Sequence, residues 1–216
     1  MEKNLLNYET LLKITQRISM SREFDDIALL SVTGVRDALE AKGCALFLIN
    51  PKTQELELAS STGLSHEYLH KGPVSALRSI ADSLKEGPVA IYDVKDDPRI
   101  QYPAEAVKEG IASILAVPIM ARGNPIGAIR IYTAEPWEFK IEDVSFVQAV
   151  AQIAGMAIEM SRLFKGLKSS IEILKAARDT REMGAKRWTP HEGVPVSAGK
   201  MRYSTEIGRA SCRERV

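Results

Sequence analysis

Two apolar segments, EGIASILAVPI (109–119) and GNPIGAIRIYT (123–133), decide the fold of this chain. Both are rich in β-branched residues, and RGNP (122–125) between them carries strong chain-breaking residues. The pattern predicts a hairpin of two antiparallel strands. Gly127 lies inside the second strand, where the missing side chain suits a bulge or a close approach of another backbone.

The same kind of pattern recurs before this hairpin. CALFLIN (44–50) is almost continuously apolar and ELELASS (55–61) alternates, which predicts a second hairpin, and PVAIYDV (88–94) predicts a fifth strand. Short helices are expected over 65–71, 76–86 and 104–109. Helical spacing of apolar residues predicts two opening helices, over 1–20 and after the expected N-cap Ser21. Together these elements predict an α+β fold: an antiparallel sheet with helices on one face.

A long helix is expected over 141–182. Beyond residue 160 its apolar residues follow the alternating four-three spacing of a coiled coil: Met160, Phe164, Leu167, Ile171 and Leu174. Such a seam needs a partner. A second copy of the same helix would give a symmetric homodimer, and packing on the N-terminal helix of the same chain is the alternative.

Composition bounds the remaining possibilities. Residues 1–164 hold 17 Lys and Arg against 22 Asp and Glu, whereas residues 165–216 hold 12 against 6. The basic residues of the tail are scattered, without a run of like charge, so we expect a disordered tail over 183–216 and no nucleic-acid binding. The final ten residues look unlike the rest and are expected to be non-native. Two distant cysteines and no membrane-spanning apolar run predict a cytoplasmic protein that does not bind membranes.

The order of these elements and several of their residues strongly resemble a GAF domain over residues 5–165, and the domain itself is expected over 21–165. The residues that carry the resemblance are Gly110, Ile111, Ser113, Ile114, Leu115, Val117 and Pro118 of the first quoted strand, Gly127 of the second, and Phe139, Glu142 and Asp143 at the start of the long helix.

The resemblance implies an antiparallel sheet of five to six strands with the N- and C-terminal helices packed on one face and a loop-covered pocket on the other. It implies a non-enzymatic sensory module, without catalytic residues, that binds an unknown small molecule and signals through a homodimer to a downstream protein. Family ligands include cyclic nucleotides, haem, bilins and metabolites, so the cofactor stays unknown. The alternative is a ligand-free dimerisation scaffold, which a core closed by Phe47, Ile114 and Ile129 would favour.

The expected pocket lies where loops border the sheet in GAF domains. Its candidate residues are Arg78, Ser79, Tyr92, Asp93, Asp97, Arg99, Tyr102 and Ile114. Arg78 or Arg99 can pair with a ligand carboxylate or phosphate through a bidentate fork, and the tyrosines can stack or donate. The structural alternative is that the aspartates and Pro98 shape a turn in which Arg99 pairs with an aspartate.

Three more specific functional hypotheses have less support in the sequence. HEYLH (66–70) matches the metalloprotease pattern, which would make the chain a zinc hydrolase with His66 and His70 as ligands, but Gly63 and Gly72-Pro73 confine its helix to under two turns. The cyclic-nucleotide pattern of GAF domains is incomplete, because Val144 follows Phe139 and Asp143 where a glutamate belongs. Thiol chemistry needs accessible cysteine, and Cys44 lies in a strand that we expect to be buried.

Overall fold

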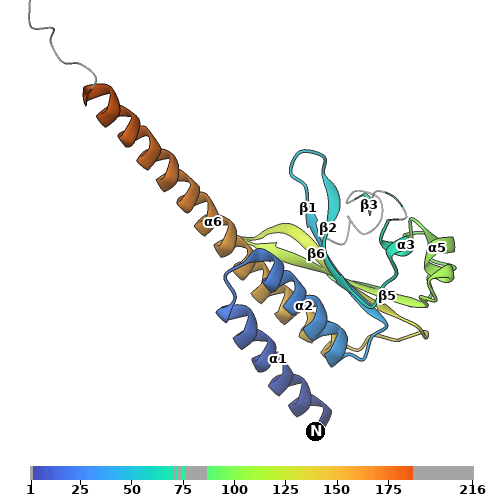
Figure 1. Cartoon of the computed structure of the whole chain (residues 1–216). Helices are drawn as coiled ribbons and strands as arrows, with labels where there is room; N and C mark the ends of the chain where they lie inside the picture. The colour runs from blue at the N-terminus through green and yellow to red at the C-terminus, as the bar shows by residue number, and fades with distance from the viewer. Residues whose placement is uncertain (1, 71, 73, 76–86, 187–216) are drawn as a thin grey trace, which may run out of the picture. The chain divides into compact units, whose positions relative to one another are not determined.

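The computed structural model describes residues 2–70, 72, 74–75 and 87–186. Its elements along the chain are α1 (Glu2–Met20), α2 (Phe24–Ala38), β1 (Gly43–Ile49), β2 (Glu55–Thr62), α3 (His66–Leu69), β3 (Val74–Ser75), β4 (Val89–Ile91), α5 (Pro103–Lys108), β5 (Ser113–Ala121), β6 (Asn124–Thr133) and α6 (Ile141–Lys186). The strands form one six-stranded sheet in the order β3-β2-β1-β6-β5-β4 (Figure 1), with antiparallel pairing throughout. The α+β fold with an antiparallel sheet is confirmed.

The central hairpin of β5 and β6 explains why its sequence is so distinctive. Its two-residue turn is Arg122-Gly123, and both residues have positive φ, which matches the right-handed twist of the strands. A Cβ built on Gly127 would lie 2.1 Å from the Phe47 carbonyl oxygen on the neighbouring strand β1. Gly127 is therefore required because the two backbones approach closely, as the sequence indicated.

The two faces of the sheet bury separate apolar clusters, because alternate side chains of a strand point to opposite faces. Helices α1, α2 and the first part of α6 pack on one face, over residues such as Leu46, Leu115 and Ile129. The other face is covered by α3, α5 and the loops around them, over Phe47, Ile114 and Tyr132 (Figure 1). We call these the helix face and the loop-covered face.

The first part of helix α6 belongs to the apolar core. Val147, Val150, Ala154 and Ile158 are fully buried against the sheet. Among the described residues, one stretch within α6, residues 141–180, is long and apolar enough to cross a membrane. A core helix has the same composition, and the buried residues of α6 account for much of it, so this is weak evidence of a membrane segment.

The end of α6 differs from the prediction. Residues 183–186, which the sequence assigned to the tail, are helical because Met183, Ala185 and Lys186 are good helix formers and no proline interrupts them. Residues 187–216 lie outside the described residues. The chain divides into two compact units, residues 1–170 and 171–216.

The predicted N-cap of α2 is wrong. Glu23 takes that position, without a side-chain hydrogen bond to the helix. Ser21 instead completes the end of α1, since its hydroxyl donates to the Arg17 carbonyl at 3.2 Å. Asp25 and Asp26 in the first turn of α2 provide the negative charge that favours a helix start.

Candidate functional site

The segments that cover the loop-covered face are held by side-chain bonds between α3 and α5. Ser65 caps α3, because its hydroxyl accepts from the Tyr68 N–H at 3.2 Å. The Ser65 N–H donates to the Glu109 carboxylate at 2.8 Å, and the Ser65 hydroxyl bonds to the same group. Lys108 pairs with Glu67 at 3.0 Å. These contacts place Tyr68, the one inward-facing residue of α3, over the sheet.

The HEYLH motif forms this short helix of four residues. The rings of His66 and His70 stack with centroids 3.9 Å apart, and Nδ1 of His70 lies 2.9 Å from the His66 carbonyl oxygen. Glu67, which would be the general base in a metalloprotease, accepts a hydrogen bond from Lys108. Within the described parts of the chain, no group of three His, Cys, Asp or Glu residues is placed to hold a metal ion.

The loop after β4 is shaped by its aspartates. Asp93 accepts from the Lys95 N–H, and Asp97 accepts from the Arg99 N–H, both at 2.9 Å. The guanidinium of Arg99 also forks onto the Asp97 carboxylate, with Nε at 2.8 Å. This pairing holds the pKa of the Asp97 carboxyl below its usual value. Arg99 and Asp97 thus satisfy each other, and direct ligand contact by either stays a prediction.

The other predicted site residues are spread over this region. Tyr92 is exposed at the end of β4, whereas Ile114 is buried beneath the loops. The Tyr102 hydroxyl accepts from the Gln101 amide and lies against Gly72, where a Cβ would come within 2.7 Å of it. Arg78 and Ser79, and the predicted helix 76–86 that contains them, lie outside the described residues. The site assignment as a whole stays a prediction.

Sequence reasoning missed Arg130, the most unusual residue of the loop-covered face. Arg130 lies at the centre of β6, is only 6% exposed, and places its guanidinium 5.2 Å from the Phe47 ring centroid. The signal was available: a charged residue inside GAIRIYT, on the opposite face from Ile129 and Ile131. Since an arginine inside an apolar strand is rarely buried, its position marks a polar site within the cluster.

Two phenols complete this cluster. Tyr68 and Tyr132 meet edge to face with ring centroids 5.7 Å apart. Burial raises the pKa of Tyr132 to about 12 although Arg130, which hydrogen-bonds to it, acts in the opposite direction. Burial also raises the pKa of Tyr68. Both hydroxyls therefore stay neutral at physiological pH and keep their protons for donation.

Cys44 faces the other way. It is fully buried in β1 among the residues of the helix face, and this burial strongly raises the pKa of its thiol. The predicted burial of its strand is confirmed. Its thiol is separated by the sheet from the Arg130 cluster, so it is not positioned to act on a molecule bound there.

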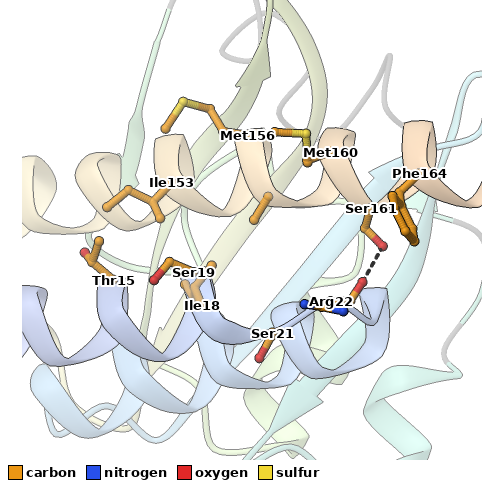
Figure 2. A pocket seen from close by; sticks show the side chains of 11 residues that line it. Thr15, Ile18, Ser19, Ser21, Arg22, Ile153, Met156, Met160, Ser161 and Phe164 are labelled. Atoms are coloured by element: carbon orange, nitrogen blue, oxygen red, sulfur yellow. Dashed lines mark hydrogen bonds between the residues drawn. The ribbon is translucent and has the colours of Figure 1, made fainter.

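A groove of about 670 Å³ lies on the helix side, between the end of α1 and α6. Figure 2 shows its mainly apolar lining, with Ile153, Met156, Met160 and Phe164 on α6. The Ser161 hydroxyl donates to the Arg22 carbonyl at 3.0 Å and ties α6 to the turn between α1 and α2 (Figure 2). The groove is continuous with the predicted seam, because Met160 and Phe164 belong to both.

The seam is open in this chain. Met160, Phe164, Leu167, Ile171 and Leu174 are 51–70% exposed. Within residues 1–170, Met160, Phe164 and Leu167 are not buried by the N-terminal helix. A stripe of large apolar side chains remains accessible to a partner.

The family model of the GAF domain matches residues 21–159. The chain belongs to the GAF domain family. GAF domains are sensory and signalling modules. A methyl sulfide methyltransferase-associated sensor of Methanosarcina acetivorans is 23% identical over 167 residues, which are 73% of this chain. The chain covers 16% of that sensor's length, so it corresponds to a small part of it.

Solved GAF structures share this fold at low identity. The GAF domain of a phosphoenolpyruvate-protein phosphotransferase from Coxiella burnetii has a TM-score of 0.68 and 22% identity, with 76% of this chain and 98% of that chain covered. The free methionine-R-sulfoxide reductase of Neisseria meningitidis, solved with its substrate, has a TM-score of 0.64 and 20% identity, with 76% and 94% covered. The GAF fold therefore occurs in an enzyme as well as in sensory modules.

The start of α6 explains the partial cyclic-nucleotide pattern of this GAF domain. The Asp143 carboxylate accepts from the Lys140 N–H at 3.1 Å, at the N-terminal end of the helix. Asp143 is buried there, and negative charge at a helix start is favourable. Its role in the structure is to begin α6.

Proposed function

We propose that this GAF domain is a non-enzymatic, cytoplasmic sensory module. In this proposal it binds a small molecule on the loop-covered face and passes the signal through a homodimer to a downstream protein. The observation that carries the proposal is the buried polar cluster of Arg130, Tyr132 and Tyr68, which lies on the opposite side of the sheet from α6. The M. acetivorans relative, which is named a sensor, supports the same role.

Ser113 offers a physical link between the two sides. It is fully buried at the start of β5, and its hydroxyl donates to the Tyr92 carbonyl at 2.5 Å and accepts from the Trp137 N–H at 2.8 Å. Tyr92 begins the loop of the candidate pocket, and Trp137 lies in the segment that leads into α6. A ligand that binds two arrangements of this loop with different affinity would thereby bias the start of α6.

The dimer is proposed from the open seam and the groove beside it. Large apolar side chains that stay exposed in a row at coiled-coil spacing are costly in water, and a second copy of the same helix covers them with matching geometry. Because the seam lies on α6, its packing between two chains would respond to a shift of that helix. This arrangement supplies a route from the pocket to a partner protein.

The scaffold alternative rests on a specific observation. Phe47 and Ile114 are both buried on the loop-covered face, as a closed core would require. Ile129, the third residue named for that closure, packs on the helix face instead and does not fill the pocket side. If the remaining residues close this face completely, the domain is a dimerisation scaffold without a ligand.

Native mass spectrometry of the full chain, with metal analysis of the same sample, tests the proposal. We expect a dimer that carries a copurified small molecule, and hydrogen exchange along residues 141–165 that changes when the molecule is removed by refolding. A dimer that never holds a molecule, with exchange in α6 unchanged, would favour the scaffold. One zinc ion per chain that is absent from the His66→Ala variant would instead support the hypothesis that HEYLH binds zinc.

A further inference from the structure

The turn of the central hairpin contains a residue type that such turns disfavour. Arg122 and Gly123 form the two-residue turn between β5 and β6, and Arg122 has a positive φ of 49°. Glycine and asparagine adopt this conformation easily, whereas a larger side chain adopts it at a steric cost. Residues held in such a conformation often have a functional or structural use for their side chain. The contacts of the Arg122 side chain indicate what that use is.

Arg122 connects the hairpin turn to the long helix. Its Nε lies 2.8 Å from a carboxylate oxygen of Glu159 on α6. The contact continues the packing of β5 along this helix, because Gly155, four residues earlier, lies against the Met120 carbonyl. Four residues of helix rise about 6 Å and two residues of strand about 6.6 Å, so Arg122 comes level with the next turn of α6. The hairpin therefore contacts α6 at two successive turns.

The ion pair lies where α6 leaves the core. Ile158 is fully buried, whereas none of residues 159–170 is buried. The side chain of Glu159 is 30% exposed and that of Arg122 is 71% exposed. Arg122 and Glu159 therefore meet at the boundary between the packed and the exposed parts of the helix. The state of this pair decides whether the hairpin turn is tied to α6 at that boundary.

A second arginine lies beside this pair. A cleft of about 410 Å³ opens between the hairpin turn and α6, and its charged lining residues are Arg122, Glu159 and Arg162. The three side chains carry two positive charges and one negative charge. One carboxylate is therefore available to two guanidinium groups in the same cleft, and the cleft leaves room for their side chains to move.

Glu159 is the acid that Arg162 can use on its own helix. It lies three residues before Arg162, and side chains at this spacing are neighbours on a helix surface. The other positions three or four residues from Arg162 hold Ile158, Lys165 and Gly166. Among the described residues, Arg162 forms no ion pair, because Glu159 is paired with Arg122. A change of partner from Arg122 to Arg162 would keep the carboxylate paired.

We propose that Arg122 and Arg162 compete for Glu159, which makes this carboxylate a latch between the central hairpin and α6. In the closed state Arg122 pairs with Glu159 and ties the hairpin turn to the helix. In the open state Arg162 pairs with Glu159 within α6 and the hairpin turn is released. Exposed ion pairs of both kinds have small and similar energies, so neither state is strongly favoured.

The latch itself needs no ligand, but its use in signalling rests on the proposed sensory function. A shift of α6 relative to the sheet would open the latch, and a closed latch would oppose that shift. Neither Glu159 nor Arg162 belongs to the seam or lines the groove beside α1. A homodimer formed through the seam therefore does not require these two residues, and the latch can be tested in the full-length protein.

The test measures how fast the Arg122 Nε–H exchanges its proton with water, by NMR of ¹⁵N-labelled full-length protein. Arg122→Asn removes the signal and so assigns it, and asparagine suits the turn. Glu159→Gln should speed proton exchange at least about fivefold, because the charge-assisted bond is lost. Arg162→Gln should slow it about twofold or more, because the closed state loses its competitor. Lys165→Gln, which removes the same charge from the same helix outside the cleft, should leave it unchanged.

The opposite signs of these two effects separate the latch from a fixed ion pair. A fixed pair would respond to Glu159→Gln but not to Arg162→Gln, so unchanged or faster proton exchange in Arg162→Gln would overturn the competition. An Arg122 signal that Glu159→Gln does not alter would overturn the latch altogether. Failure of the proposed function gives a different result: a chain that holds no small molecule and forms no dimer, yet shows both responses, keeps the latch and loses the sensory role.

Discussion

Replacing Gly155 in α6 by alanine should destabilise the domain, although the same change usually stabilises a helix. Alanine is favoured over glycine by about 1 kcal/mol inside a helix. A Cβ on Gly155, however, would lie 2.5 Å from the Met120 carbonyl oxygen and 3.0 Å from a methyl group of Ile119. Since backbone must move to relieve that contact, overpacking should cost about 1–3 kcal/mol or more and outweigh the propensity gain.

Gly166→Ala is the matched control on the same helix. Apart from the adjacent residues and the backbone of the same helix turn, no atom lies within 4 Å of a Cβ at that position, so only the helix propensity gain applies and stability should stay equal or rise by up to about 1 kcal/mol. Urea unfolding followed by circular dichroism measures both variants, with the slope used to check that the transition is unchanged. Gly155→Ala at or above the wild-type midpoint would refute the close packing of α6 on β5.

Leu167→Ala should raise the Kd of the homodimer about 30-fold, since losing part of an exposed seam leucine costs roughly 1 kcal/mol per chain. Sedimentation equilibrium measures this Kd, and Lys165→Ala on the same helix is the control that should leave it unchanged. Ser113→Ala should lower the free energy of unfolding by about 1–3 kcal/mol, because the Trp137 N–H loses its acceptor. An unchanged urea midpoint would contradict the proposed connection from the Tyr92 loop through Ser113 to the segment before α6. Burial raises the pKa of the Cys44 thiol and raises that of Tyr132 to about 12. The unfolded chain therefore releases these protons at lower pH than the folded chain does. The free energy of unfolding should be at its full value below roughly pH 8.5 and fall above it. Urea unfolding from pH 7 to pH 10 should show this fall, and Cys44→Ala should reduce it; a midpoint that rises over this range would refute the buried thiol.

Local pattern carried most of the fold. The breaker residues between two apolar strands predicted the central hairpin, and the structure closes it at Arg122-Gly123 with both residues at positive φ. For Gly127 the sequence indicated a bulge or a close backbone approach, and the structure shows the close approach. Alternation, turns and helical spacing depend on residues near one another in the chain, so they can be read without knowing the tertiary contacts.

The errors occurred where two segments meet. Ser21 looks like the cap of α2, but its hydroxyl bonds back to α1, because the end of the first helix lies close enough to use it. For the candidate pocket residues the sequence left two possibilities open, and Asp97 and Arg99 do pair with each other, as one of them stated; ligand contact by the candidate residues stays a prediction. The short helix expected for HEYLH is confirmed, since α3 has four residues.

By itself, the sequence determined five of the six strands, the hairpins and the long helix, since each follows from short-range periodicity and a few special residues, and its resemblance to GAF domains indicated the family. Only the tertiary structure decided that Arg130 shares a buried face with Tyr132 and Tyr68, and that Cys44 lies behind the sheet. The physical reason is that a strand shows which residues share a face, but not which face is covered by helices and which by loops. That choice depends on packing between segments far apart in the chain.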